Sequence, residues 1–274
     1  MANRALTPKL NFPKSLWERR ELWWQLTKRE ITGRYRGSQL GLGWSILNPI
    51  LMLAVYTFVF SQIFKARWGT AEGHGPWGFA VNLFAGLIVF NLFAECASRA
   101  PTLILNNPNY VKKVVFPLEI LSAVSVGSAL FHAMTSLTVL LVFEVIVFGR
   151  IPDTAYWLPL VWAPLILASL AVSWILAALG VFLRDIGQII GVLVSMLMFL
   201  SPVFFPISAV PEGLQWALKI NPLAGVIEQT RKVLIVGGSP QPLEIITGII
   251  TGCIACELSY RGFQKIKSSF ADVI

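Results

Sequence analysis

The stretch LEILSAVSVGSALFHAMTSLTVLLVFEVIVF, residues 118–148, decides the fold of this 274-residue chain. Within it, only Glu119 and Glu144 carry a formal charge at neutral pH. About 20 helical residues cross the hydrocarbon core of a bilayer, so the stretch is long enough to span a membrane, with some turns that tilt or protrude. We therefore expect an all-α integral membrane protein.

The composition of the whole chain agrees with this expectation. Hydrophobic residues make up 55% of the chain, charged residues only 13%, and the mean hydropathy is +0.69. Soluble domains carry about 25% charged residues, so this chain has too few to cover a water-soluble globule. The net charge of +8 would indicate a nucleic-acid partner in a soluble protein. In a membrane protein it is typical of basic residues held on the cytoplasmic side, and we expect no nucleic-acid partner.

Five more apolar stretches accompany the first. The six predicted transmembrane helices lie near residues 46–64, 79–104, 118–148, 157–182, 186–205 and 243–260. Arg184 and Asp185 separate the fourth from the fifth. A charge at mid-membrane costs about 3 kcal/mol, so this pair predicts a turn at the membrane surface rather than one longer helix.

Six spans place both termini on one side of the membrane. Sixteen of the 22 lysine and arginine residues then fall on the side of the termini and six on the other. Basic residues are enriched in cytoplasmic segments, so both termini are predicted to be cytoplasmic. The chain divides accordingly into a cytoplasmic region, 1–45, and a six-helix transmembrane domain, 46–274.

The first region contains KSLWERRELWWQLTKREITGRYRGS, residues 14–38. Trp17, Trp24 and Ile31 recur every seven residues among arginines and lysines. Tryptophan rings mixed with cations are typical of a helix that lies in the plane of the membrane surface. We expect a cytoplasmic arm followed by such an amphipathic interface helix; a plain membrane anchor is the alternative.

The loop between the second and third spans is NNPNYVKKVVFP, residues 106–117, here called the coupling segment. Pro108 and Pro117 frame it, and Lys112 and Lys113 make it basic. Proline fixes its own φ and restricts the residue before it, so the segment is expected to be rigid. A simple cytoplasmic turn is the other interpretation.

The connection before the last span, 206–242, is longer than a turn requires. Within it, AGVIEQTRKVLIVGG (224–238) has helical periodicity. One face is predicted to carry Val226, Ile227, Thr230, Val233 and Leu234, and the other Glu228, Gln229, Arg231 and Lys232. This helix is too short to cross a bilayer, so we expect 206–236 to form a re-entrant helical hairpin.

Motifs for catalysis are missing from the sequence. It contains no GxxxxGK[ST], HExxH or GxSxG pattern and no metal-ligand spacing, so no catalytic residue, metal or cofactor is predicted in this chain. His74 and His132 are the histidines available to the alternative of a membrane-bound acyltransferase. Glu95 and Arg99 are four residues apart and can pair on one helix face, either as a structural ion pair or in gating.

Aromatic residues are abundant, with 10 tryptophans and 18 phenylalanines. Most tryptophans near span ends are typical of a belt at the membrane interface. Trp174, Phe199, Phe204 and Phe205 are candidates for a second role, in which aromatic rings stack on the apolar faces of sugars. Both interpretations remain open at this point.

Five short stretches occur in a fixed order: RYRGSQLGLGWSILNP (34–49), NPNYVKKVVFPLEI (107–120), GVFLRDI (180–186), MFLSPVFFP (198–206) and NPLAGVIEQTR (221–231). In that order they resemble the permease subunit of ATP-binding-cassette exporters of bacterial polysaccharides, with the O-antigen type closest. The resemblance implies a homodimer in the bacterial inner membrane that binds two copies of a separate ATPase. ATP and Mg would be bound by that ATPase, and the substrate would be a lipid-linked polysaccharide.

The resemblance also implies roles for single residues. The coupling segment would contact the ATPase through Asn107, Pro108, Tyr110, Lys112, Lys113, Phe116 and Pro117. Arg34 and Arg36 would bind the lipid pyrophosphate, Glu95, Arg99, Glu228 and Arg231 would form gating ion pairs, and the four aromatic residues would hold the glycan. The alternatives are export of capsular polysaccharide, teichoic acid, drugs or small lipids, and the acyltransferase.

Overall fold

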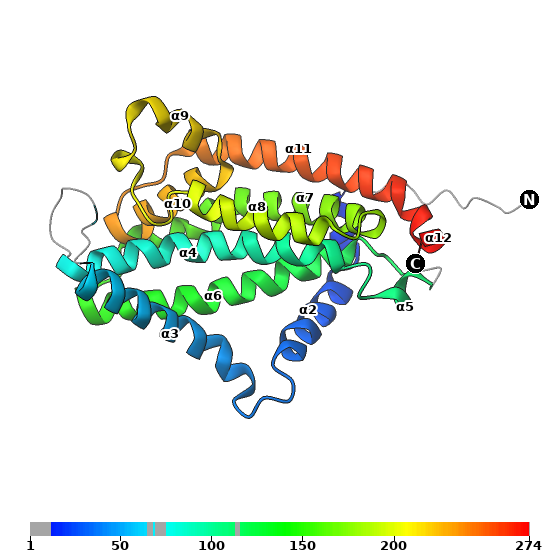
Figure 1. Ribbon diagram of the computed structural model, residues 1–274, viewed down its shortest axis with the longest axis horizontal. Helices are drawn as coiled ribbons and strands as arrows, with labels where there is room; N and C mark the ends of the chain where they lie inside the picture. The colour runs from blue at the N-terminus through cyan, green and yellow to red at the C-terminus, as the bar shows by residue number, and fades with distance from the viewer. Residues whose placement is uncertain (1–11, 65–67, 69–74, 113–115, 274) are drawn as a thin grey trace, which may run out of the picture.

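The computed structural model describes residues 12–64, 68, 75–112 and 116–273 (Figure 1). Every regular element in these residues is helical, which confirms the all-α prediction. The α-helices are α1 (Phe12–Glu18), α2 (Arg20–Arg34), α3 (Trp44–Thr57), α4 (Gly75–Arg99), α5 (Pro108–Val111), α6 (Ile120–Phe148), α7 (Leu158–Phe182), α8 (Ile186–Leu200), α9 (Glu212–Ile220), α10 (Pro222–Arg231), α11 (Pro242–Ile266) and α12 (Phe270–Val273). Short 3-10 and π turns extend several of them.

Five helical segments in the described residues are long and apolar enough to cross a membrane. They are Gly41–Phe60, Trp77–Thr102, Ile120–Phe148, Asp153–Phe182 and Pro242–Val273. The predicted span 186–205 corresponds to α8, which has only 15 residues. The helix stops at Leu200 because Pro202 disfavours a helical conformation at Ser201, which is extended.

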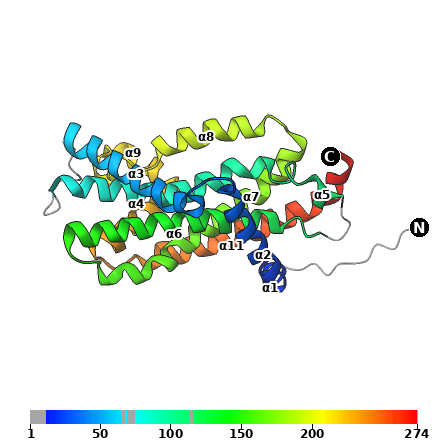
Figure 2. The same cartoon turned by 90° about the horizontal axis from the view of Figure 1, so that it is seen from below.

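The long helices run side by side along the longest axis of the molecule (Figures 1 and 2). The helices α3, α6 and α8 run in one direction, and α4, α7 and α11 run in the other (Figure 1). The helices α5 and α12 lie at one end of this bundle, while α9 and α10 lie at the opposite end (Figure 1). The start of α3 lies away from the bundle, and α3 packs against α4 and α6.

The centre of the bundle is α4, in which every residue from 79 to 90 is buried. It packs against α6, α7, α8 and α10. By contrast, α8 has no buried residue, and α3 exposes large apolar side chains such as Leu51, Met52 and Val55. Apolar surface of this kind is expected where a helix faces lipid.

The first region folds as two helices, α1 and α2. Trp17 of α1 and Trp24 of α2 are exposed, while Leu26 and Thr27 of α2 are buried. Trp23 fixes α2 to α6, because its indole N–H donates to the carbonyl of Ala123 at 2.8 Å. The helix α2 therefore leaves Trp24 exposed and packs Trp23 and Leu26 on the bundle.

Candidate functional site

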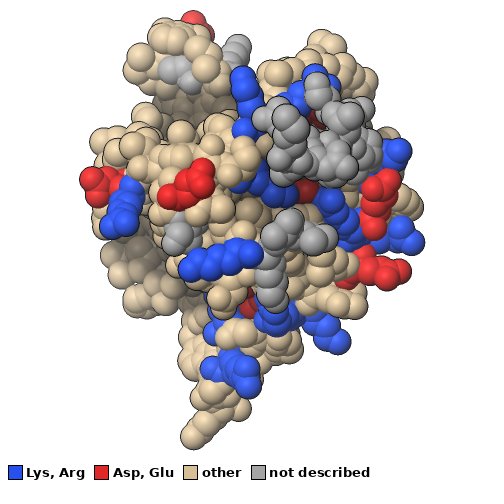
Figure 3. Space-filling view, turned by 90° about the vertical axis from the view of Figure 1, so that its right-hand side faces the viewer, with Lys and Arg blue, Asp and Glu red and all other residues tan. Residues whose placement is uncertain are grey.

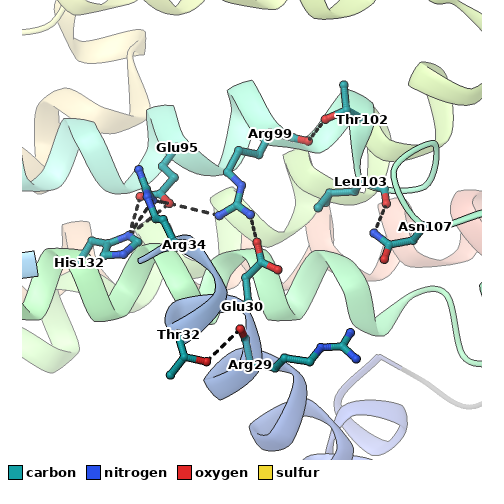
Figure 4. A network of polar contacts seen from close by, with 10 residues as sticks. All are labelled: Arg29, Glu30, Thr32, Arg34, Glu95, Arg99, Thr102, Leu103, Asn107 and His132. Carbon is teal, nitrogen blue, oxygen red and sulfur yellow. Dashed lines mark hydrogen bonds and ion pairs between the residues drawn. The ribbon is translucent and has the colours of Figure 1, made fainter. Parts of the chain in front are cut away.

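A network of charged side chains joins α2 to the two central helices α4 and α6 (Figure 4). The Glu95 carboxylate accepts from the Arg34 guanidinium, from Arg99 at 3.3 Å and faces His132 Nδ1 at 3.0 Å. Arg99 also pairs with Glu30 of α2. The expected contact between Glu95 and Arg99 is therefore present, and Glu30 and His132 extend it. Sequence reasoning missed Glu30, although its four-residue spacing from Arg34 was available as a signal.

His132 lies between two oppositely charged groups. Its Nδ1 is 3.0 Å from Glu95 Oε2 and 3.1 Å from the Arg34 Nη1. Nδ1 can donate to the carboxylate or accept from the guanidinium, but one nitrogen cannot do both at once. The other ring nitrogen, Nε2, is buried without a hydrogen-bond partner. His132 thus joins α6 to both charged helices, as a helix-to-helix hydrogen-bonding group does.

The two arginines proposed for the pyrophosphate differ in their surroundings. The Arg34 side chain is half exposed, although it pairs with Glu95. Arg36 is exposed in the connection after α2. In this connection Gly37 and Gly41 have φ of 88° and 50°, which is left-handed backbone that L side chains rarely adopt. The network therefore includes Arg34, and Arg36 lies outside it.

The coupling segment forms one short helix, α5, with Pro108 at its first turn. The Asn107 amide donates to the Leu103 carbonyl at 2.9 Å. The Tyr110 ring stacks on Phe116 with centroids 4.1 Å apart, and its hydroxyl accepts from Arg29 of α2 at 2.6 Å. Lys112 is exposed, and Lys113 lies outside the described residues. The segment is thereby attached to the interface helix.

Glu119 lies directly before α6 and contacts residues of several other elements. The sequence analysis predicted no role for it. It is 2% exposed, pairs with Arg19 between α1 and α2, and accepts from Lys267 at 2.8 Å. Its carbonyl accepts from the Trp174 indole of α7 at 2.9 Å. Burial raises the pKa of the Glu119 carboxyl, but the charges of Lys267 and Arg19 outweigh burial, so the pKa lies below its usual value.

Replacing Glu119 with glutamine should lower the stability at pH 7 by about 2 kcal/mol, because charged hydrogen bonds are lost. A carboxyl whose pKa is lowered by folding stabilises the protein above its unfolded pKa, and this contribution disappears as the pH falls through the folded value. The thermal midpoints of wild type and Glu119→Gln in detergent should therefore converge below about pH 4. Glu18→Gln, at an exposed position nearby, is the control. A difference that does not change with pH would contradict the assignment.

At the other end of the bundle, Arg231 is buried with 3% exposure. Its guanidinium donates to the carbonyls of Asn82 at 3.0 Å and Val203 at 2.8 Å, and pairs with Glu228 at 2.8 Å. It also lies over the Trp68 ring, 4.3 Å from the centroid. Arg231 therefore joins α10 to α4, to the chain after α8 and to Trp68.

The predicted apolar face around α10 is buried as expected, but half of the predicted polar face is buried as well. Gln229 and Arg231, assigned to the polar face, are buried together with Val226, Ile227 and Thr230. Gln229 donates to Glu244 at 2.6 Å, at the start of α11. The helix is enclosed on several sides, so its polar residues find partners on neighbouring helices instead of facing water.

The four candidate aromatic residues do not form one surface. Trp174 is fully buried, and its ring contacts Phe12 and Tyr260 edge-on. Such a ring has no free face for a sugar, so we exclude Trp174 from a role in glycan stacking. Phe199 is 66% exposed and stacks on Phe204 at 5.7 Å, and Phe205 is partly exposed close by in the chain.

Across the described ranges, no group of three His, Cys, Asp or Glu side chains is placed to hold a metal ion. The polar contacts connect helices: α2 to α4 and α6, the segment after Pro117 to α7 and the C-terminal end, and α10 to α4. This arrangement suits the transmission of movement between helices.

The sequence of the chain matches a known family of membrane proteins. The family described as ABC-2 type transporter matches residues 21–235. The chain belongs to the ABC-2 type transporter family. With its apolar helices, this ABC-2 type transporter protein is a multi-pass membrane protein.

Its curated relatives carry descriptive names. The O-antigen export system permease protein RfbA of Klebsiella pneumoniae is 26% identical over 251 residues, covering 91% of this chain and 93% of that protein. RfbA of Myxococcus xanthus is 26% identical over 95% of this chain and 98% of its own length. The polysialic acid transport protein KpsM of Escherichia coli is 27% identical over 76% of this chain and 79% of its own length.

Proposed function

We propose that this chain is the transmembrane subunit of an ATP-driven exporter that moves a lipid-linked polysaccharide of the O-antigen type across the bacterial inner membrane. The observation that carries the proposal is the match to O-antigen export permeases over more than nine-tenths of the chain. Export of a capsular polysaccharide is the second candidate, favoured by the similarity to the polysialic acid transport protein.

We propose six spans with both termini in the cytoplasm and α8, extended through residues 201–205, as the fifth span. The helices α3, α4, α6, α7, α8 and α11 alternate in direction along the chain, which supports this count (Figure 1). Lysine and arginine side chains gather on the end of the molecule that carries α5 and α12 (Figure 3), as expected for a cytoplasmic face. The working unit is a homodimer with two ATPase subunits, which bind ATP and Mg.

Energy enters through the coupling segment in this proposal. The ATPase pushes on α5 through exposed residues such as Lys112, while Tyr110 transmits the movement to α2 through Arg29. Glu119 then connects the end of the segment to α7 and to the C-terminal end. The short helix and its stacked ring are stiff enough to transmit a displacement rather than absorb it.

The substrate path begins at Arg34 and Arg36, whose guanidinium groups match phosphate oxygens. The re-entrant hairpin formed by α9 and α10 is the outer gate, and Arg231 with Glu228 holds it against α4. Phe199, Phe204 and Phe205 near this gate offer ring faces on which sugars stack.

A deletion strain tests the function. Surface polysaccharide should disappear and accumulate inside the cell when the gene is removed, and the wild-type gene should restore it. The Lys112→Glu, Lys113→Glu variant should insert into the membrane at normal level and restore less than about a tenth of the surface polysaccharide, because reversed charge weakens the ATPase contact. Immunoblots of surface and intracellular glycan measure both results.

Two outcomes decide between interpretations. Normal surface polysaccharide in the deletion strain, with altered drug sensitivity, would favour an exporter of drugs or small lipids. Full restoration by the double lysine variant would remove the coupling assignment and leave the export function intact. His132 belongs to the charged network, so His74→Ala is the variant that separates the acyltransferase from the exporter: it should export normally, whereas loss of activity would favour the acyltransferase.

A further inference from the structure

Glu95 occupies the position on Arg34 that a phosphate oxygen would take. Carboxylate and phosphate both offer paired oxygens to a guanidinium, so one guanidinium cannot be fully paired with both at the same time. Arg34 is the last residue of α2, and its side chain remains half exposed while paired. A lipid headgroup at the membrane surface can therefore reach it.

We propose that Glu95 competes with the diphosphate of the lipid-linked substrate for Arg34 and thereby sets the affinity of this site. The inference rests on the proposed function and adds Glu95 and His132 as specificity-determining residues. In the absence of substrate the Arg34–Glu95 pair is closed. Substrate binding transfers Arg34 from the carboxylate to the phosphate oxygens.

The network is built so that Glu95 can release Arg34. A buried carboxylate left without any partner is strongly unfavourable. Glu95, whose side chain is 17% exposed, keeps two partners when Arg34 leaves: Arg99 at 3.3 Å and His132 at 3.0 Å. Without Arg34, the His132 Nδ1 is free to donate to the carboxylate alone. Arg99 stays oriented because Glu30 holds it.

Release of Arg34 also frees the end of α2. Besides the Arg34–Glu95 pair, Glu30 and Arg99 connect α2 to α4 one turn earlier. The chain then continues through Gly37 and Gly41, whose surroundings are open. Binding of the diphosphate thus removes one of the contacts that hold the end of α2 on α4, just before the chain continues toward α3.

The test measures binding of farnesyl diphosphate to the purified permease–ATPase complex in neutral phosphatidylcholine nanodiscs. Glu95→Gln keeps the size of the side chain and removes the charge that holds Arg34, so binding should tighten about fivefold. Arg34→Ala should lose binding, and the double variant should behave like Arg34→Ala. Glu21→Gln removes an exposed carboxylate from the same helix and should leave binding unchanged, which controls for general electrostatics.

Unchanged or weaker binding by Glu95→Gln would overturn the competition. A parallel experiment measures the binding of phosphatidylglycerol. If Glu95→Gln binds phosphatidylglycerol more tightly but farnesyl diphosphate no more tightly than wild type, the competition is overturned as well, because the ligand is then a membrane headgroup. Should Glu95→Gln fail to assemble, Glu95→Asp keeps the charge but withdraws the carboxylate by one methylene, and about twofold tightening is expected. The proposed export function is tested separately, by returning the wild-type gene to the deletion strain. When that gene restores export, a negative binding result removes only the competition between Glu95 and the diphosphate.

Discussion

Replacing Arg231 with alanine should destabilise the protein by about 4 kcal/mol and abolish export. The substitution leaves the carbonyls of Asn82 and Val203 without their donor in a buried site, and each such loss costs about 1–3 kcal/mol. It also removes the contact with the Trp68 ring and leaves a cavity between α4 and α10. Thermal unfolding in detergent and the level of surface polysaccharide measure the two effects.

Matched variants separate charge from shape at this position. Arg231→Lys keeps the positive charge, but an ammonium group cannot reproduce the flat arrangement of donors, so a large part of the loss should remain. Lys232→Ala changes the next basic residue, which is only half-buried, and should alter the thermal midpoint little. If both arginine variants unfold at the wild-type temperature, the buried contacts of Arg231 contribute nothing to the fold.

A single methyl group at Gly180 should be almost as damaging. A Cβ at this position would lie 2.0 Å from the backbone carbonyl oxygen of Pro101. Because the neighbour is backbone, the segment after α4 would have to move away from α7, and we expect a loss of about 3 kcal/mol. The yield of folded Gly180→Ala in the membrane and its thermal midpoint are the measurements.

Gly191 provides the matched control. It lies on α8, and no atom lies within 4 Å of the position that an alanine Cβ would take, so Gly191→Ala meets open space. In a helix, alanine is favoured over glycine by about 1 kcal/mol, so this variant should be as stable as wild type or more so. Equal behaviour of the two variants would show that the contact between α7 and the segment after α4 is not tight.

The fold follows from local patterns that a sequence displays. Apolar runs locate α3, α4, α6, α7 and α11, and the Arg184–Asp185 pair marks the turn before α8. The helix in the predicted fifth span ends at Leu200, five residues before the predicted end of the span, because Pro202 disfavours a helical conformation at Ser201 inside an apolar run. Periodicity also locates α10, which begins at Pro222.

The contacts of the site depend on partners far away in the chain. Arg231 donates to a carbonyl 149 positions away, and Glu119 pairs with a lysine 148 positions away. A helical wheel of α10 cannot reveal that Gln229 and Arg231 meet neighbouring helices, so their polar character wrongly indicates an outer face. The prediction for Trp174 is wrong for the same reason, since depth in a span does not tell whether a ring faces a path or the core. Pairs four residues apart, such as Glu95 and Arg99, are within reach of sequence reasoning.

The length of α8 has a consequence for the surrounding lipid. Fifteen helical residues rise about 22 Å, whereas the hydrocarbon core of a bilayer is about 30 Å thick. Residues 201–205 complete the proposed span, and 201–203 are buried, so the non-helical backbone there is shielded from lipid. The surface that α8 offers to lipid is thus about 22 Å long, and the rest of this crossing is made inside the protein.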